Sequence, residues 1–192
     1  MVENVWFTSD QHFFHEKLLE YIPTRPKDYN QIMIDNWNMS INDSDIVYVL
    51  GDLTAGVTKF IKDNGLVVDS FQLVSSLVSE LKGRKIFIRG NHDYFTNEQF
   101  VEMGFESCQE TLELGEFFLT HYPMLPDKYM NEKMKMVVDK HLEIFNDSDC
   151  KYIIHGHSHE TNYGGNRFNV AMDLNGYTPV NIDEIKGYFK QI

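Results

Sequence analysis

The sequence predicts an α/β fold in which short strands alternate with helices. Three observations support this: six short apolar runs rich in Val, Ile, Phe and Tyr, helical patterning between them, and polar residues directly after most of the runs. With 192 residues, of which 42% are hydrophobic and 14% aromatic, the chain can bury a core and fits one domain spanning residues 1–192. No repeat or linker marks a boundary within it.

The expected elements follow in chain order. The strands are short runs of β-branched and aromatic residues at 4–8, 46–50, 85–89, 116–120, 151–154 and 167–172. Helices are expected at 16–21, 29–39, 70–81, 97–103 and 130–145, the last three with spaced apolar positions. Residues 22–26 and 122–126 each contain two prolines, so both are expected to be loops.

The charge balance excludes several classes of function. The chain carries 17 basic and 29 acidic residues, a formal net charge of −12. This balance argues against general binding to duplex nucleic acid or anionic membranes, which needs a basic patch. No apolar run approaches the ~18 residues of a membrane span, and the first residues lack the pattern of a secretory signal. Because Cys108 and Cys150 are isolated, we expect reduced thiols and a cytoplasmic protein.

Side chains that can bind metals follow five of the expected strands. The carboxyl ends of strands are the usual location of ligand sites in open α/β sheets. The donors exceed what one transition metal takes but suit two ions that share a bridging carboxylate, which would activate a water for displacement at phosphorus. The absence of cysteine favours Mn, Fe, Ni, Co or Zn, and the histidines argue against Ca or Mg alone. The seven candidate ligands are Asp10, His12, Asp52, Asn91, His121, His157 and His159.

These residues form an ordered set of motifs: Asp-x-His, Gly-Asp, Gly-Asn-His-Asp, a lone His, and Gly-His-x-His. The set resembles the signature of the calcineurin-like metallophosphoesterase superfamily over residues 10–159. It is similar to small single-domain bacterial and phage-type members, in which a further His follows the first motif, here His15, and whose tail resembles residues 168–173. The resemblance implies a four-layer αββα sandwich of two mixed β-sheets flanked by helices, with a dimetal site at the carboxyl edge of the strands. The element pattern alone leaves a three-layer doubly wound sheet open.

The resemblance also implies a role for each site residue. One metal would be held by Asp10, His12, Asp52 and His159, and the other by Asp52, Asn91, His121 and His157. Asp52 would thus bridge two divalent transition-metal ions, with Mn²⁺ the first candidate and Fe, Ni, Co or Zn the alternatives. His92 would face the substrate and assist the leaving group, and Asp93 would orient His92.

The second and third motifs depart from the protein-phosphatase branch of the family. In that branch, Gly-Asp-x-Val-Asp-Arg-Gly supplies an Arg that grips phosphate, whereas residues 51–56 read Gly-Asp-Leu-Thr-Ala-Gly. The chain therefore looks more like the phosphodiesterase-type members, and we expect in-line hydrolysis of a phosphoester by a metal-bridging hydroxide. Arg25, Arg89 and Arg167 are the candidates for a replacement cation.

Two other functions fit parts of the sequence. A catalytically inactive protein-interaction scaffold, like the retromer subunit that shares this fold, would have lost ligands, whereas this chain keeps every matching position. The alternation of His155, His157 and His159 suggests a metallo-β-lactamase-like hydrolase. That family places its cluster early in the chain and includes an Asp-His pair, whereas here the cluster is late and is followed by Glu160.

Other histidines are left outside the implied metal set. His15 fits either a substrate-contacting residue or a solvated helix residue, and His155 is expected to pack at a strand end or to support a ligand. His141 lies in a charged helical stretch and is expected on the surface. Specificity is expected in the loops at 21–29 and 121–130, with nucleotides among the candidate phosphoesters. No pattern indicates an oligomeric state.

Overall fold

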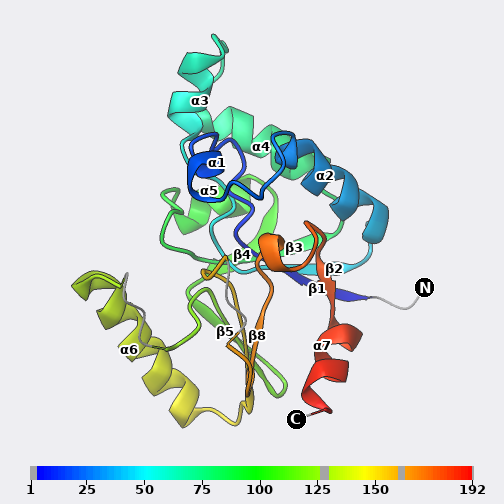
Figure 1. Cartoon of the computed structure of the whole chain (residues 1–192), viewed down its shortest axis with the longest axis vertical. Coiled ribbons are helices and arrows are strands. Elements are labelled where there is room, and N and C mark those ends of the chain that lie inside the picture. The colour runs from blue at the N-terminus through cyan, green and yellow to red at the C-terminus, as the bar shows by residue number, and fades with distance from the viewer. Residues whose placement is uncertain (1–3, 126–129, 160–162, 192) are drawn as a thin grey trace.

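The computed structural model describes residues 4–125, 130–159 and 163–191, and its strands form two mixed sheets (Figure 1). The first sheet has the order β4-β3-β2-β1-β9 and the second the order β5-β6-β7-β8. The strands are β1 (Val5–Thr8), β2 (Ile46–Val49), β3 (Arg84–Ile88), β4 (Phe105–Gln109), β5 (Thr111–Leu114), β6 (Phe117–Thr120), β7 (Tyr152–His155), β8 (Arg167–Asn169) and β9 (Val180–Asn181). The helices are α1 (Leu18–Tyr21), α2 (Tyr29–Ser40), α3 (Val57–Asp63), α4 (Ser70–Glu80), α5 (Asn97–Glu102), α6 (Glu132–Asp147) and α7 (Ile182–Phe189), with a 3-10 turn at Met172–Leu174.

Alternating side chains divide the core into layers. Val47 and Val49 of β2 pack against α2 and α4, in a cluster that includes Trp37 of α2. Tyr48, between them, points the other way and packs with residues of the second sheet and α7. This period of two gives the first sheet one face toward its helices and one toward the second sheet.

The outer face of the second sheet is covered by α6. Phe118 of β6 and Ile153 of β7 pack against Leu142 and Phe145 of that helix. Figure 1 shows the remaining layers, with α1 to α5 gathered beyond the first sheet and α6 on the far side of the second. The arrangement is the four-layer αββα sandwich, which confirms the fold implied by the motifs and excludes the three-layer alternative.

The start of each central helix is set by its sequence. Asp69 and Thr96 begin α4 and α5, and each forms a capping box with a Gln three residues later. A capping box satisfies backbone N–H groups that have no partner within the helix. In α2 the fully buried Trp37 donates its indole N–H to the carbonyl of Lys82 at 2.9 Å, which ties the helix to the segment before β3.

All expected elements are present, and with one exception their ends agree with the structure to within two residues. The exception is the strand expected at 167–172, which ends at Asn169 because the chain then passes from the second sheet to the first. The Val170 N–H donates to the carbonyl of His155 at 2.8 Å, and the Met172 N–H donates to the carbonyl of Ser9 at 3.1 Å. This crossing brings the following residue, Asp173, beside the end of β1.

Five elements were not expected from the sequence: β4, β5, β9, α3 and α7. The strands β4 and β5 lie at sheet edges and carry polar residues on their open faces. Neither therefore forms the kind of continuous apolar run that predicts a strand. The sequence of α7 does contain a pattern that predicts a helix, because the buried residues Ile185 and Phe189 are four positions apart. In the described part of the chain, no helix is long and apolar enough to cross a membrane.

Candidate metal centre

The seven candidate ligands lie together where the strands of both sheets end. Three of them follow β1 and β2 of the first sheet, and one follows β3. The other three follow β6 and β7 of the second sheet, which run parallel to each other. Hydrogen bonds between the loops fix this convergence, because the Asp10 N–H donates to the Gly51 carbonyl and the His12 N–H to the Asp52 carbonyl, each at 3.0 Å.

The backbone at four of these positions is left-handed. The φ angle is 59° at Asp10, 49° at His12, 55° at Asp52 and 70° at His157. Residues other than glycine adopt this region at a cost, although Asp, Asn and His adopt it more readily than most. Such clustering is characteristic of functional sites, where the surrounding structure holds the strained conformation in place.

One group of ligand atoms surrounds the carboxylate of Asp10. His12 Nε2 lies 3.5 Å from Asp52 Oδ2 and 3.9 Å from Asp10 Oδ1. His159 Nε2 lies 3.7 Å from the same Asp10 oxygen. One ligand atom from each of Asp10, His12 and His159 lies within 4.8 Å of the others, as expected for atoms that each bind one ion at about 2 Å.

A second group surrounds His121. Its Nε2 lies 3.5 Å from Asp52 Oδ2, 3.0 Å from Asn91 Oδ1 and 3.2 Å from His157 Nδ1. Asp52 Oδ2 is thus equally distant from His12 and His121, one histidine in each group. This is the position that a bridging carboxylate between two ions would occupy.

The polar atoms of the site fit bound cations. Asp10 Oδ1 and both ring nitrogens of His12 are buried and make no hydrogen bond to any described residue. Burial of unpartnered polar atoms is costly, and a cation that accepts a lone pair from Asp10 Oδ1 and from one ring nitrogen of neutral His12 would reduce this cost. The residues present therefore fit two divalent ions held by nitrogen and oxygen donors.

Burial and neighbouring charges shift the pKa values of the site. Burial and the neighbouring Asp10 raise the pKa of Asp52 to about 8. Burial also opposes ionisation of Asp10, but His121 and His159 outweigh it and lower the pKa of Asp10. Burial, with His159 and His92 nearby, lowers the pKa of His12 well below its usual value. Dications would hold Asp52 ionised and the histidines neutral, the forms that bind metal.

Asp173 holds His159 from outside the candidate ligand set. His159 Nδ1 lies 2.6 Å from Asp173 Oδ2, which leaves Nε2 facing Asp10. The buried guanidinium of Arg25 donates to both oxygens of Asp173 and also to the backbone carbonyls of Asp10 and Gln11. Sequence reasoning gave Asp173 no role, although it ends the tail that resembles the family.

Asp93 has a different set of contacts from the one expected. Its carboxylate accepts the backbone N–H groups of Gly90 at 2.6 Å, Asp52 at 2.9 Å and Leu53 at 3.3 Å, rather than a proton of the His92 ring. Burial and the charge of Asp52 raise the pKa of Asp93 to about 7. Asp93 therefore fixes the two motif loops against each other. His92 is exposed, and its ring lies 5.3 Å from that of His12.

The three arginines considered as phosphate-binding cations are all engaged elsewhere. Arg25 is bound as described above. Arg89 donates to the carbonyls of Asp93 and Phe95, and Arg167 donates to the carbonyl of Pro123. Each guanidinium thus stabilises a loop.

The remaining histidines differ in their surroundings. His155 is fully buried at the end of β7, as expected, and its Nδ1 lies 2.9 Å from the carbonyl oxygen of Gly156. His15 is half-buried, with its ring 5.7 Å from that of His12. The expectation for His141 was wrong: only 1% of the residue is exposed, because α6 turns it toward Thr120 of β6. Glu160 lies outside the described residues.

Two glycines allow the loops to approach the carboxylates. A Cβ atom on Gly90 would lie 2.6 Å from the backbone nitrogen of Asp52, and one on Gly156 would lie 2.6 Å from Cβ of Ser9, beside Asp10. Atoms at these positions would overlap, so neither position accepts a side chain without displacing a candidate ligand.

Comparison with known proteins agrees with this geometry. The calcineurin-like phosphoesterase family matches residues 3–161. An uncharacterized protein of Methanocaldococcus jannaschii, MJ1445, is 29% identical over 196 residues, covering 96% of this chain and 90% of its own. The gene 66 protein of Mycobacterium phage L5 is 26% identical, covering 82% and 78%. The crystal structure of a protein of unknown function from Aquifex aeolicus, AQ665, shares the fold with a TM-score of 0.72 at 24% identity, covering 97% and 99%.

Proposed function

The chain belongs to the calcineurin-like phosphoesterase family, and we propose that it is a metal-dependent hydrolase that prefers phosphodiesters. The observation that carries the proposal is the position of Asp52 Oδ2, 3.5 Å from His12 Nε2 and 3.5 Å from His121 Nε2. A carboxylate shared between two groups of nitrogen and oxygen donors is the arrangement that a pair of divalent ions requires.

The proposed metal sets follow the two groups of side chains. When bound, the two ions would supply an activated water and neutralise charge on the phosphate. The donor set of nitrogen and oxygen atoms supports Mn²⁺ as the first candidate. We assign one ion to Asp10, His12, Asp52 and His159, and the other to Asp52, Asn91, His121 and His157.

We assign proton donation to the leaving oxygen to His92. Its ring is exposed at the mouth of the site beside His12, and its backbone N–H donates to Asp52 Oδ1 at 2.8 Å, which fixes its position. An imidazole can deliver a proton to a leaving oxygen. Partial burial and the nearby His121 lower the pKa of His92, which makes its protonated form a stronger acid. Asp93 supports this position through the loop backbone. The preference for diesters is supported by Arg25, Arg89 and Arg167, whose guanidinium groups are held in loop contacts. A phosphomonoester carries more negative charge than a diester and needs more cationic side chains to bind it.

The test is hydrolysis of bis-p-nitrophenyl phosphate and p-nitrophenyl phosphate by metal-stripped protein reloaded with Mn²⁺. We expect turnover of both, a higher kcat/KM for the diester, and loss of activity in Asp52→Asn. Asp45→Asn is a matched control, because Asp45 is also a buried carboxyl but lies at the opposite end of β2. Absence of turnover in the wild type would refute the proposal. Absence of metal binding as well would favour the inactive scaffold.

A further inference from the structure

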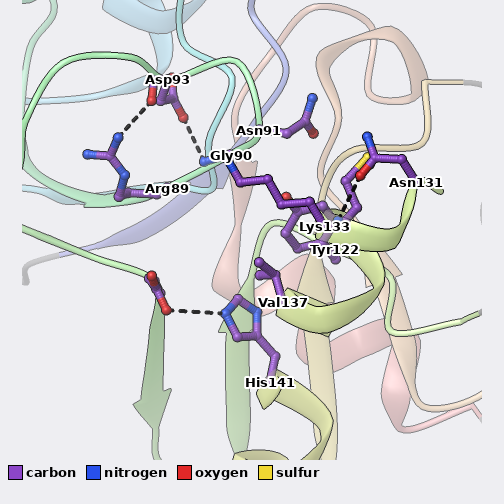
Figure 2. Close-up of a pocket in the computed structure, with 11 residues that line it drawn as sticks. Arg89, Gly90, Asn91, Asp93, Tyr122, Asn131, Lys133, Val137 and His141 are labelled. Carbon is purple, nitrogen blue, oxygen red and sulfur yellow. Dashed lines mark hydrogen bonds and ion pairs between the residues drawn. The ribbon is translucent and has the colours of Figure 1, made fainter. Parts of the chain in front are cut away.

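A pocket of about 450 Å³ extends from the candidate metal centre along α6. It begins at Asn91, one of the candidate ligands, and passes between the loop after β3 and the helix (Figure 2). None of the pocket residues on α6 belongs to the metal sets. The volume lies within the range of ~300–1,000 Å³ that is usual for small-molecule sites.

His141 presents an unpartnered nitrogen to this pocket. The residue is 1% exposed, and its Nδ1 lies 3.1 Å from Oγ1 of Thr120. Its Nε2 is buried without a hydrogen bond to any described residue, and the nearest acid, Oε2 of Glu110, is 3.8 Å away. That distance is too long for a hydrogen bond. A ligand atom in the pocket would satisfy the nitrogen, whose burial is otherwise unfavourable.

The middle of the pocket is apolar and aromatic. Val137 and Met134 come from the same face of α6 as His141, since the three positions are three and four residues apart. Figure 2 shows Val137 between His141 and the ring of Tyr122. Tyr122 is itself buried, so its ring is a fixed surface. Such a wall favours a flat ring over a flexible chain.

A cation lies at the end of the pocket nearest the metal centre. Lys133 extends from the first turn of α6 toward Gly90 in Figure 2. It is exposed and forms no ion pair with any residue in the part of the chain that the structure describes. It is therefore available to an anionic group at the metal centre, a role that Arg25, Arg89 and Arg167 do not fill.

We propose that this pocket binds the ester group that stays on the phosphate, and that this group is an uncharged planar ring with a hydrogen-bonding edge. The inference rests on the proposed hydrolase function and deepens it. The phosphate lies at Asn91 and Lys133, the ring packs on Tyr122 and Val137, and its polar edge meets His141. Glu110 lies beside His141 at the same end, where its Oε2 accepts a hydrogen bond from Lys140 at 2.7 Å.

The test uses two p-nitrophenyl diesters with the same leaving group. In thymidine 5′-(p-nitrophenyl) phosphate the retained group carries a planar imide ring, whereas in ethyl p-nitrophenyl phosphate it does not. We expect the wild type to have a kcat/KM about tenfold or more higher for the thymidine ester. Val137→Trp fills the pocket and should bring this ratio close to one. Val101→Trp is the control: it places the same side chain at an exposed position of α5 and should leave both rates unchanged.

Equal rates for the two esters in the wild type would overturn the pocket assignment, as would a ratio unchanged by Val137→Trp. If Val137→Trp does not fold, His141→Phe removes the hydrogen-bonding nitrogen and should lower the same ratio. If neither ester is hydrolysed, the proposed function fails, and calorimetric binding of thymidine decides the pocket alone. Binding that is lost in His141→Phe supports the pocket, and no binding to the wild type refutes it.

Discussion

The contact between His159 and Asp173 leads to a prediction about metal affinity. Asp173→Asn keeps the size of the side chain but removes the charge of the carboxylate. In the wild type this carboxylate accepts hydrogen bonds from His159 Nδ1 at 2.6 Å and from Arg25 Nε at 2.9 Å. Burial opposes protonation of His159, but Asp173 and Asp10 outweigh it and raise the pKa of His159. The contact therefore orients the ring and increases its affinity for positive charge, whether a proton or a metal ion.

Removing such an outer partner costs about 10–100-fold in metal affinity, or roughly 1.4–2.7 kcal/mol. We expect this loss in calorimetric titration of metal-stripped Asp173→Asn with Mn²⁺, at the ion that His159 binds. The variant also leaves the buried Arg25 without its charged partner, so the free energy of unfolding is expected to fall by about 3 kcal/mol or more.

A control separates loss of stability from loss of metal binding. Asp45 is also buried and accepts hydrogen bonds from Asn4, Trp6 and Asn42, far from the metal centre. Asp45→Asn should destabilise the fold but bind Mn²⁺ as the wild type does. Wild-type affinity in Asp173→Asn, or an equal loss in Asp45→Asn, would refute the role given to Asp173.

Three further predictions follow from packing and burial. Gly156→Ala should weaken Mn²⁺ binding in calorimetric titration, because the added Cβ would overlap atoms beside Asp10. The control is Gly187→Ala in α7, where the added Cβ meets open space. This variant should bind Mn²⁺ normally, and its free energy of unfolding should rise by up to about 1 kcal/mol. Burial lowers the pKa of His141. As the pH falls below about 6.5, the unfolded state therefore takes up a proton before the folded state does, and the free energy of unfolding decreases. Between pH 7.5 and 5.5, urea denaturation of His141→Gln should show a smaller decrease than that of the wild type. Phe87→Ala removes a fully buried ring stacked on Phe100 at 4.1 Å and should lower the free energy of unfolding by about 3–5 kcal/mol, measured by urea denaturation.

The parts of the fold that could be predicted from sequence are those with local patterns. The runs that became β1, β2 and β3 are apolar because both faces of the first sheet are covered. Edge strands β4 and β5 need apolar residues on one face only, so their sequences look like loops. The crossing at 170–172 depends on hydrogen bonds to Ser9 and His155, both distant in sequence, and no local pattern predicts it.

The site divides in the same way. Its candidate ligands lie directly after strands, in motifs short enough to identify along the chain. The role of Asp173 depends on contacts with Arg25 and His159 across the fold, and only the structure reveals it. His141 was misjudged because its neighbours in sequence, including Lys140, are exposed and charged, whereas its own side chain faces Thr120. A position on a helix face is decided by what the helix packs against.

The left-handed backbone at Asp10, His12, Asp52 and His157 has a consequence for the lifetime of the protein. Glycine would relieve the strain at each position but would remove a ligand atom, so the strain and the metal site are inseparable. Four such residues, at roughly 1–3 kcal/mol each, are a large fraction of the 5–15 kcal/mol that stabilises a typical domain. Ion binding to the folded state offsets this cost. We therefore expect chains made under metal starvation to unfold more often and to be degraded faster, so that metal supply sets protein abundance as well as activity.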